Sequence, residues 1–82
     1  MMTAKDLNRF LYAVGTGLYR IREDAGMSRA ALQQKTKIHK NTILRYENGA
    51  ASPTLRIIAV LADALGYEVR VSFVKKEGGE TE

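Results

Sequence analysis

Apolar side chains recur at intervals of three and four residues over the first 26 positions of the chain. This spacing places them along one side of an α-helix, so the sequence predicts a helix that begins after Thr3 and ends at Gly26. Gly15 and Gly17 lie inside it, and a glycine costs about 0.5–1 kcal/mol relative to alanine in a helix. A break into two helices near Thr16 is the alternative, although the apolar stripe continues across that point. The stripe consists of Leu7, Phe10, Leu11, Val14, Leu18, Ile21 and Ala25.

Two shorter helices are predicted next. Ser28 is expected to be the N-cap of a helix from about 29 to 36, because its hydroxyl can accept a hydrogen bond from a free backbone N–H. A break near Lys37 separates this helix from a second one, from about 40 to 47, which ends at Asn48-Gly49. The side chains expected to face a core are Ala30, Ala31, Leu32, Ile38, Ile43 and Tyr46.

The surface of this helix pair is expected to be wholly cationic. No acidic residue lies between Ala25 and Tyr46. The basic residues in that interval are Arg29, Lys35, Lys37, Lys40 and Arg45. A helix pair with such a surface suits a polyanion. On the second helix, the side chains predicted to face outward are Lys40, Asn41, Leu44 and Arg45.

The next apolar segment predicts a helix from Leu55 to Leu65, with Thr54 as its N-cap and Gly66 closing it. It is apolar almost throughout and therefore has two faces. The face expected to join the core consists of Leu55, Ile58, Leu61, Ala62 and Leu65. The second face consists of Ile57, Val60 and Ala64. In so small a domain a second apolar face is either exposed or covered by another chain, so it is assigned to an interface.

Residues 67–74 alternate between apolar and polar side chains, which predicts a half-buried β-strand. No second strand is recognisable, and a lone strand cannot satisfy its own backbone, so it is expected to pair with a second copy of itself. The predicted fold is mostly α: a small helical domain, residues 1–74, with one C-terminal strand that pairs across a homodimer, followed by a disordered tail at 75–82. The predicted dimer interface consists of Ile57, Val60, Tyr67, Val69, Val71 and Phe73.

Composition narrows the range of functions. The 82 residues form one small domain with a formal net charge of +4. There is no cysteine and one histidine, and no catalytic constellation is recognisable, so we expect neither an enzyme nor a metal or cofactor. No apolar run approaches the ~20 residues of a membrane span, and the cytoplasm is the expected location. Arg9, Arg20 and Arg22 lie off the apolar stripe of the first helix and are interpreted as a solvated surface.

The second predicted helix ends in the run Thr42-Ile43-Leu44-Arg45-Tyr46-Glu47-Asn48-Gly49. This run resembles the recognition helix of the Cro/repressor-like (XRE) class of helix-turn-helix DNA-binding proteins, and the resemblance covers about residues 16 to 66. Gln33 stands where the class usually has alanine, Lys37 where it has glycine, and Leu44 where it often has serine. A lysine at positive φ costs on the order of 1 kcal/mol relative to glycine, so these departures bear on the angle between the two helices.

The resemblance implies a repressor that binds double-stranded operator DNA. The implied base contacts come from Lys40, Asn41, Leu44 and Arg45. The implied phosphate contacts come from Arg29, Lys37, His39, Thr42 and Asn48. The chemistry agrees with the first set, because arginine can donate bidentately to guanine and asparagine can pair with adenine. Glu47 is interpreted as structural, holding an arginine or nearby backbone.

The predicted strand narrows the resemblance. A helix-turn-helix domain that ends in such a strand, with the sequence Leu-Gly-Tyr-x-Val-x-Val at residues 65–71, is similar to antitoxins of the HigA and HipB type. Those proteins repress their own operons and bind a toxin, which implies a cognate toxin as a second partner. The alternatives are a protein-binding module and a phage-type regulator without a toxin.

Overall fold

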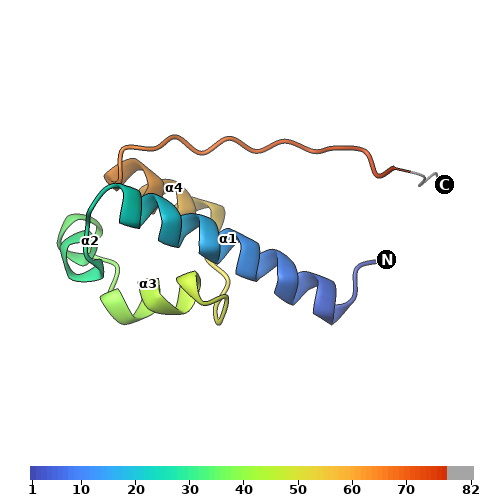
Figure 1. Ribbon diagram of the computed structural model, residues 1–82, viewed down its shortest axis with the longest axis horizontal. Helices are drawn as coiled ribbons and strands as arrows, with labels where there is room; N and C mark the ends of the chain where they lie inside the picture. The colour runs from blue at the N-terminus through green and yellow to red at the C-terminus, as the bar shows by residue number, and fades with distance from the viewer. Residues whose placement is uncertain (78–82) are drawn as a thin grey trace.

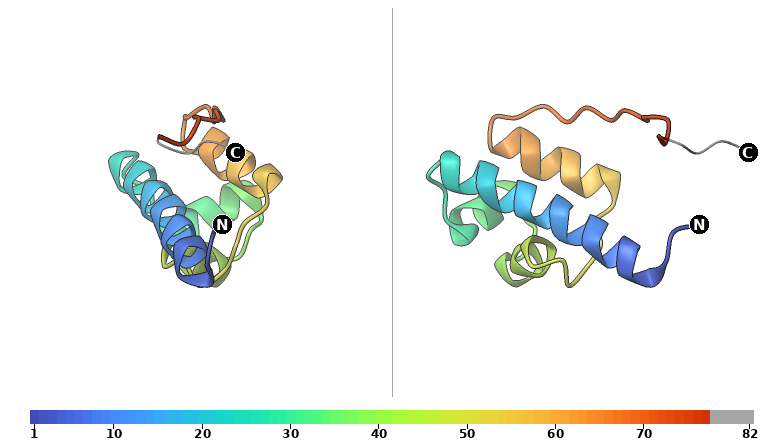
Figure 2. Two further views of the ribbon diagram at one scale, coloured as in Figure 1. Left: turned by 90° about the vertical axis from the view of Figure 1, so that its right-hand side faces the viewer. Right: turned by 45° about the vertical axis from the view of Figure 1, so that its right-hand side comes forward.

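Four α-helices make up the regular structure of the computed structural model, which describes residues 1–77 (Figure 1). They are α1 (Ala4–Asp24), α2 (Arg29–Thr36), α3 (Lys40–Glu47) and α4 (Leu55–Ala64). The long helix α1 packs against α3 and α4, and α2 packs against the same two helices. Figure 2 shows α4 along one side of α1 and α3 along the other. None of the helices in the described part of the chain is long and apolar enough to cross a membrane.

Helix α1 is continuous, so the alternative break near Thr16 does not occur. Its first turn is closed by a capping box, in which the Thr3 hydroxyl accepts from the Asp6 N–H at 3.1 Å and the Asp6 carboxylate accepts from the Thr3 N–H at 3.0 Å. Hydrogen bonding from the Thr3 backbone, and next from its side chain, holds the pKa of Asp6 below its ordinary value. After the helix, Gly26 takes the left-handed conformation, with φ of 65°.

The core takes at least one buried side chain from every helix. One cluster contains Leu18 of α1, Leu32 of α2, Ile43 of α3, Leu61 of α4 and Leu65 just after α4. The partly buried residues packed around them are Ile21, Met27, Ile38, Tyr46, Ile57 and Ala64. Two residues that were predicted to face the core, Ala30 and Ala31, are exposed instead. The core is therefore small, and other interactions must fix how the helices meet.

Helix α4 faces the core with most of the predicted face, because Leu61, Ala62 and Leu65 are buried and Ile58 is partly buried. Leu61 and Leu65 lie at the centre of the buried sector, which takes in Ile57 from the predicted second face. Leu55 was predicted to be buried, but it lies in the first turn and is 68% exposed. Both faces of this helix are apolar, so its rotation is set by contact with α1 and α2, and periodicity alone could not determine it.

Residues 67–74 follow α4 as an extended arm, drawn in orange along the top of Figure 1. The predicted strand is not present in the single chain: the described residues contain no strand, and no backbone group from 68 to 74 bonds to the backbone of another described residue. The physical reason is that a strand needs a second backbone beside it. Residues 78–82, which belong to the predicted tail, lie outside the described residues.

Helices α1 and α3 meet backbone to backbone at Gly15. A β-carbon at this position would collide with the carbonyl oxygen of Tyr46 and would lie 2.8 Å from that of Glu47. Gly17, in the same helix, differs, because a β-carbon there would have nothing within 4 Å. Glycine is therefore required at the first position, where α1 approaches the end of α3, and is not required at the second.

Replacing each glycine by alanine should show that glycine is required at position 15 and not at position 17. Gly15→Ala should lower the free energy of unfolding by about 1–3 kcal/mol or more, because the new methyl group forces the two helices apart. Gly17→Ala is the matched control and should raise it by about 0.5–1 kcal/mol, because alanine favours the helix. Urea denaturation followed by circular dichroism measures both. Equal effects of the two substitutions would contradict the close approach at Gly15.

Candidate nucleic-acid interface

Helices α2 and α3 have the predicted boundaries and are joined by residues 37–39. The Ser28 hydroxyl caps α2 by accepting from the Ala31 N–H at 3.0 Å. His39 caps α3, since its Nδ1 accepts from the Asn41 N–H at 3.1 Å. This cap needs an unprotonated Nδ1 and leaves Nε2–H as the outward donor of the imidazole.

Lys37 occupies the left-handed conformation in the turn between the two helices. Its φ is 66°, and it is the one non-glycine residue with positive φ among residues 1–77. This conformation costs roughly 1–2 kcal/mol for a residue with a β-carbon. The turn gains a compensating contact, because Oε1 of Gln33 in α2 accepts from the Lys40 N–H of α3 at 2.9 Å. Two of the three departures from the class pattern, Gln33 and Lys37, thus adjoin the same turn, and the glutamine amide satisfies a free N–H at the start of α3.

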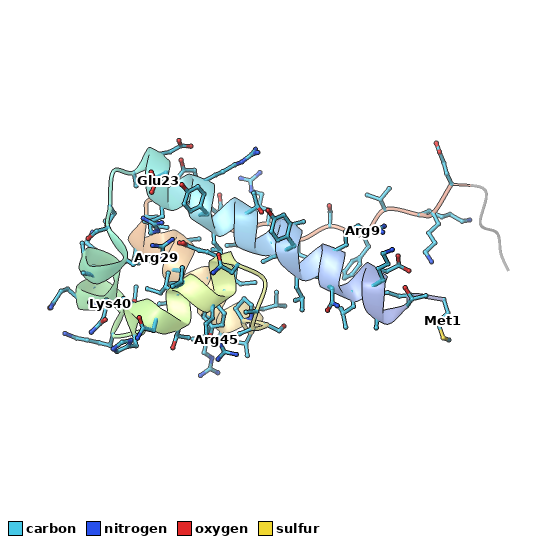
Figure 3. All side chains as sticks on the ribbon, turned by 60° about the horizontal axis from the view of Figure 1, so that its bottom comes forward. Met1, Arg9, Glu23, Arg29, Lys40 and Arg45 are labelled. Carbon is cyan, nitrogen blue, oxygen red and sulfur yellow. The ribbon has the colours of Figure 1, made fainter. Side chains whose placement is uncertain are left out.

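The outer surface of α3 carries the four residues predicted to contact bases. All four side chains are exposed: Lys40, Asn41, Leu44 and Arg45. Figure 3 shows Lys40 and Arg45 along α3, with Arg29 between α3 and α1. Arg45 donates from Nη2 to the Ala50 carbonyl at the long distance of 3.4 Å, so most of its donor capacity faces solvent. The surface combines hydrogen-bond donors, an amide and one apolar side chain, which is the chemistry that base edges in a major groove require.

The residues predicted to contact phosphate lie in different surroundings. Lys37 and His39 are exposed at the start of α3, and Asn48 is exposed just after its end. Thr42 is partly buried within the helix. Arg29 stands at the start of α2, but its guanidinium is held by an internal carboxylate. Lys37, His39 and Asn48 therefore lie at the two ends of the exposed surface of α3. Their phosphate contacts stay predictions.

Glu47 is the buried centre of an ionic network that joins three helices. Its Oε2 accepts from Nε of Arg22 in α1 at 2.7 Å, and its Oε1 accepts from Nη2 of Arg22 at 3.2 Å. The same Oε1 accepts from Nε of Arg29 in α2 at 2.8 Å. Arg22 donates further from Nη1 to the Met27 carbonyl at 2.9 Å, in the loop between α1 and α2. The structural interpretation of Glu47 agrees with these contacts.

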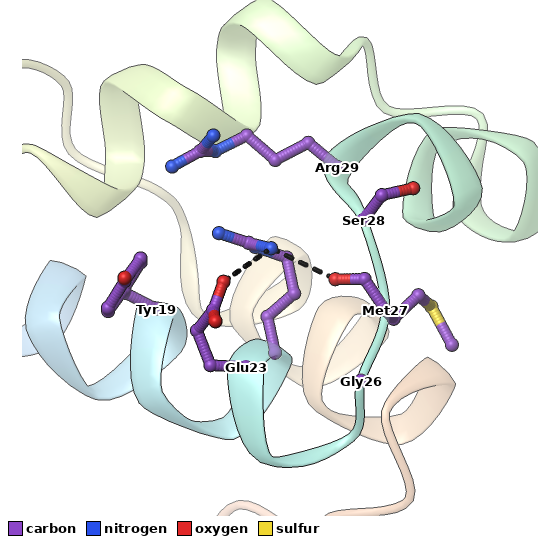
Figure 4. A pocket seen from close by; sticks show the side chains of 7 residues that line it. Tyr19, Glu23, Gly26, Met27, Ser28 and Arg29 are labelled. Carbon is purple, nitrogen blue, oxygen red and sulfur yellow. Dashed lines mark hydrogen bonds and ion pairs between the residues drawn. The ribbon is translucent and has the colours of Figure 1, made fainter.

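The interpretation of Arg22 as a solvated surface residue was wrong. Arg22 is only 4% exposed, and its guanidinium lies 5.4 Å from the centre of the Tyr19 ring. Figure 4 shows the pocket beside the network, whose lining includes Tyr19, Glu23, Met27 and Arg29. Hydrogen bonding to Glu47 raises the pKa of Arg22 in spite of burial, so the arginine stays charged. Nothing local in the sequence marks this role, because its carboxylate partner lies 25 positions away.

The network predicts a large effect of Glu47→Gln. Removing the negative charge leaves Arg22 buried with only the half-exposed Glu23 to balance its charge, and breaking a buried pair in this way costs about 3–5 kcal/mol. Glu23→Gln is the matched control, since Glu23 also pairs with Arg22, at 3.3 Å, but is half exposed, and such a pair contributes about 1 kcal/mol or less. Denaturant titration gives the free energies of unfolding. A Glu47→Gln protein as stable as the Glu23→Gln protein would contradict the central role of the network.

Comparison with known proteins gives one family. The family model described as helix-turn-helix matches residues 18–71, which is more than half of the chain. The match includes the network, the turn and the exposed surface of α3. Comparisons with curated proteins and with solved structures gave no match. The chain belongs to the helix-turn-helix family of DNA-binding transcription regulators, in its Cro/repressor-like (XRE) class.

Proposed function

We propose that the protein is a sequence-specific transcriptional repressor that binds double-stranded operator DNA as a homodimer in the cytoplasm. The observation that carries the proposal is the outer surface of α3, where Lys40, Asn41, Leu44 and Arg45 are exposed together on a helix anchored at both ends. The Gln33 amide and the His39 imidazole fix the start of this helix. The carboxylate of Glu47 fixes its end.

In the proposed complex α3 enters the major groove. Arg45 donates to guanine, Asn41 pairs with adenine, Lys40 donates to guanine or to phosphate, and the Leu44 side chain meets a thymine methyl group. The phosphates that flank the groove are contacted by Lys37, His39 and Asn48. Thr42 contributes less to phosphate binding because it is partly buried. Arg29 contributes chiefly by holding Glu47, and only its remaining N–H groups are left for phosphate.

Two substitutions should distinguish base reading from phosphate contact. Arg45→Ala should cost roughly 1–3 kcal/mol of operator binding and relax the preference at one base pair. Lys37→Gly should weaken binding to all sequences alike and reduce the salt slope by about 1, while it stabilises the fold because glycine accepts the left-handed conformation. Fluorescence anisotropy with operator and random duplexes, at several salt concentrations, measures both. An Arg45→Ala protein with unchanged preference at every base pair would contradict base reading by this residue.

The arm supports the homodimer. It carries Tyr67, Val69, Val71 and Phe73 into solvent, and its backbone groups from 68 to 74 have no backbone partner among the described residues. Two arms related by a twofold axis can satisfy each other as antiparallel strands. Val60 of α4 is exposed, and its place in the interface stays a prediction, whereas Ile57 packs against the core of its own chain and can contribute little to a dimer.

Removal of residues 68–82 should therefore yield a monomer with intact helices. It should lose operator affinity by about 100-fold or more, because each half-site then binds without its tethered mate. Removal of residues 75–82 alone is the control and should leave the dimer intact. Sedimentation equilibrium decides the oligomeric state, and a dimer that survives the longer truncation would place the interface elsewhere, on α1.

We propose further that the repressor is the antitoxin of a toxin-antitoxin pair. One support is the resemblance of residues 65–71 to the junction in HigA- and HipB-type antitoxins. The other is that a toxin can bind to surfaces away from α3 while α3 binds DNA. A neighbouring toxin gene, co-expressed, should give a complex that still binds operator in gel filtration. A neighbouring gene product that is not toxic, and that does not bind, would leave a phage-type regulator without a toxin.

A further inference from the structure

A hollow of about 370 Å³ lies between the outer side of α1, the start of α2 and the end of α3. Arg29 and Asn48, two of the residues predicted to contact phosphate, line it together with the buried carboxylate of Glu47, which arginines already neutralise. The remaining lining residues all come from α1, and they are Tyr12, Thr16, Tyr19 and Arg20. Helix α1 lies close to the end of α3 here, since a β-carbon at Gly49 would be 3.1 Å from Cα of Tyr12. The exposed surface of α3 therefore continues onto α1.

A polar side of α1 runs from this hollow to the first turn of the helix. Its residues recur at intervals of three and four, and they are Lys5, Arg9, Tyr12, Thr16 and Arg20. All of them are exposed except Thr16, which is partly buried. Figure 1 shows α1 slanting downward, so that its first turns reach the lower edge of the molecule, where α3 also lies. The family match begins at residue 18, so residues 4–17 of this helix lie outside the part shared with the family.

The charges on the polar side of α1 favour a polyanion. Within residues 1–77, neither Lys5 nor Arg20 is paired with a carboxylate. The nearby acidic residues are engaged elsewhere, because Asp6 closes the capping box and Glu23 pairs with Arg22. Phosphate oxygens accept hydrogen bonds from ammonium, guanidinium and hydroxyl groups, and this side of the helix offers all three.

We propose that α1 is a further DNA-contacting element, and that the hollow receives a backbone phosphate of the duplex that α3 binds. The proposal rests on the DNA binding proposed above and adds contacts that α2 and α3 do not supply. Asn48, Tyr12 and Arg20 donate to the phosphate in the hollow, and Lys5 donates to a phosphate farther along the same strand.

The length of the polar side agrees with more than one phosphate contact. Lys5 and Arg20 are about 22 Å apart along the helix, at about 1.5 Å per residue. One strand of DNA carries a phosphate about every 3.4 Å of helix axis. The two cations can therefore reach different phosphates, and each such contact releases counterions and adds to the salt dependence of binding.

Removal of two charges from this side tests the proposal in the full-length protein. The double variant Lys5→Gln/Arg20→Gln should bind operator and random duplex alike about tenfold more weakly, and its salt slope should fall by about 1.8, which is about 0.9 for each lost phosphate contact. The matched control is Lys75→Gln/Lys76→Gln, which removes the same charge from the far end of the arm and should leave the slope unchanged. Fluorescence anisotropy at several salt concentrations measures both. A double variant whose slope falls no further than that of the control would overturn the proposal.

Thr16→Lys is the opposite test, because it adds a cation to the hollow that Thr16 lines. It should raise the salt slope by about 0.9 and tighten binding to every duplex, a result that loss of fold stability cannot produce. Hydroxyl-radical footprinting locates the contact. In the Lys5→Gln/Arg20→Gln variant, protection should be lost over a few nucleotides beside the half-site and kept over the half-site itself. Unchanged protection, or unchanged binding by the Thr16→Lys protein, would contradict a contact from α1.

These measurements separate the inference from the proposed function. A wild type that binds operator specifically, with a double variant that behaves like the control, leaves the repressor and removes α1 from the DNA interface. A double variant that keeps its salt slope but loses a bound acidic protein would make this side of α1 a protein-binding surface, and would also overturn the inference. A wild type without sequence preference would contradict base reading by α3, while the salt slopes with random duplex would still test α1.

Discussion

The carboxylate of Glu47 accepts hydrogen bonds from Arg22 of α1 and Arg29 of α2 while it closes the last turn of α3. A buried carboxylate is costly unless it is paired and hydrogen-bonded, so these arginines can occupy only a few positions. The apolar core is small and is built largely from leucine, which adapts to several packings. The ionic network is therefore the interaction that selects one arrangement of α1, α2 and α3.

The exposed surface of α3 depends on that arrangement. Gly15 lets α1 approach the end of α3 closely enough for Arg22 to reach Glu47. At the other end, Lys37 turns the chain and Gln33 holds the first N–H of α3. Base reading requires side chains placed with sub-ångström accuracy, and a helix held at both ends meets that requirement better than one held by apolar contacts alone.

Local signals predicted the local structure. The caps at Ser28, Thr54 and Gly26 gave the helix boundaries, and the exposure of Arg45 and its neighbours followed from helical period. Contacts between distant residues were predicted only in part: Glu47 was expected to hold an arginine, but the sequence did not identify Arg22 or Arg29 as that arginine. Arg22 looked like a surface arginine because its partner is remote in sequence, and Leu55 looked buried because both faces of α4 are apolar. The arm has strand-like alternation, but a strand requires a second backbone, and a single chain does not supply one.

We propose that α3, held in this frame, reads a specific DNA sequence. The most direct measurement selects duplexes bound by the purified protein from a random pool, sequences them, and compares the affinity of the consensus with that of unrelated DNA at physiological salt. Base reading by the α3 helices of a homodimer predicts a palindromic consensus with half-sites about 10 bp apart. It also predicts a preference of about 10³-fold or more over unrelated DNA. Equal affinity for the selected and unrelated duplexes would contradict it.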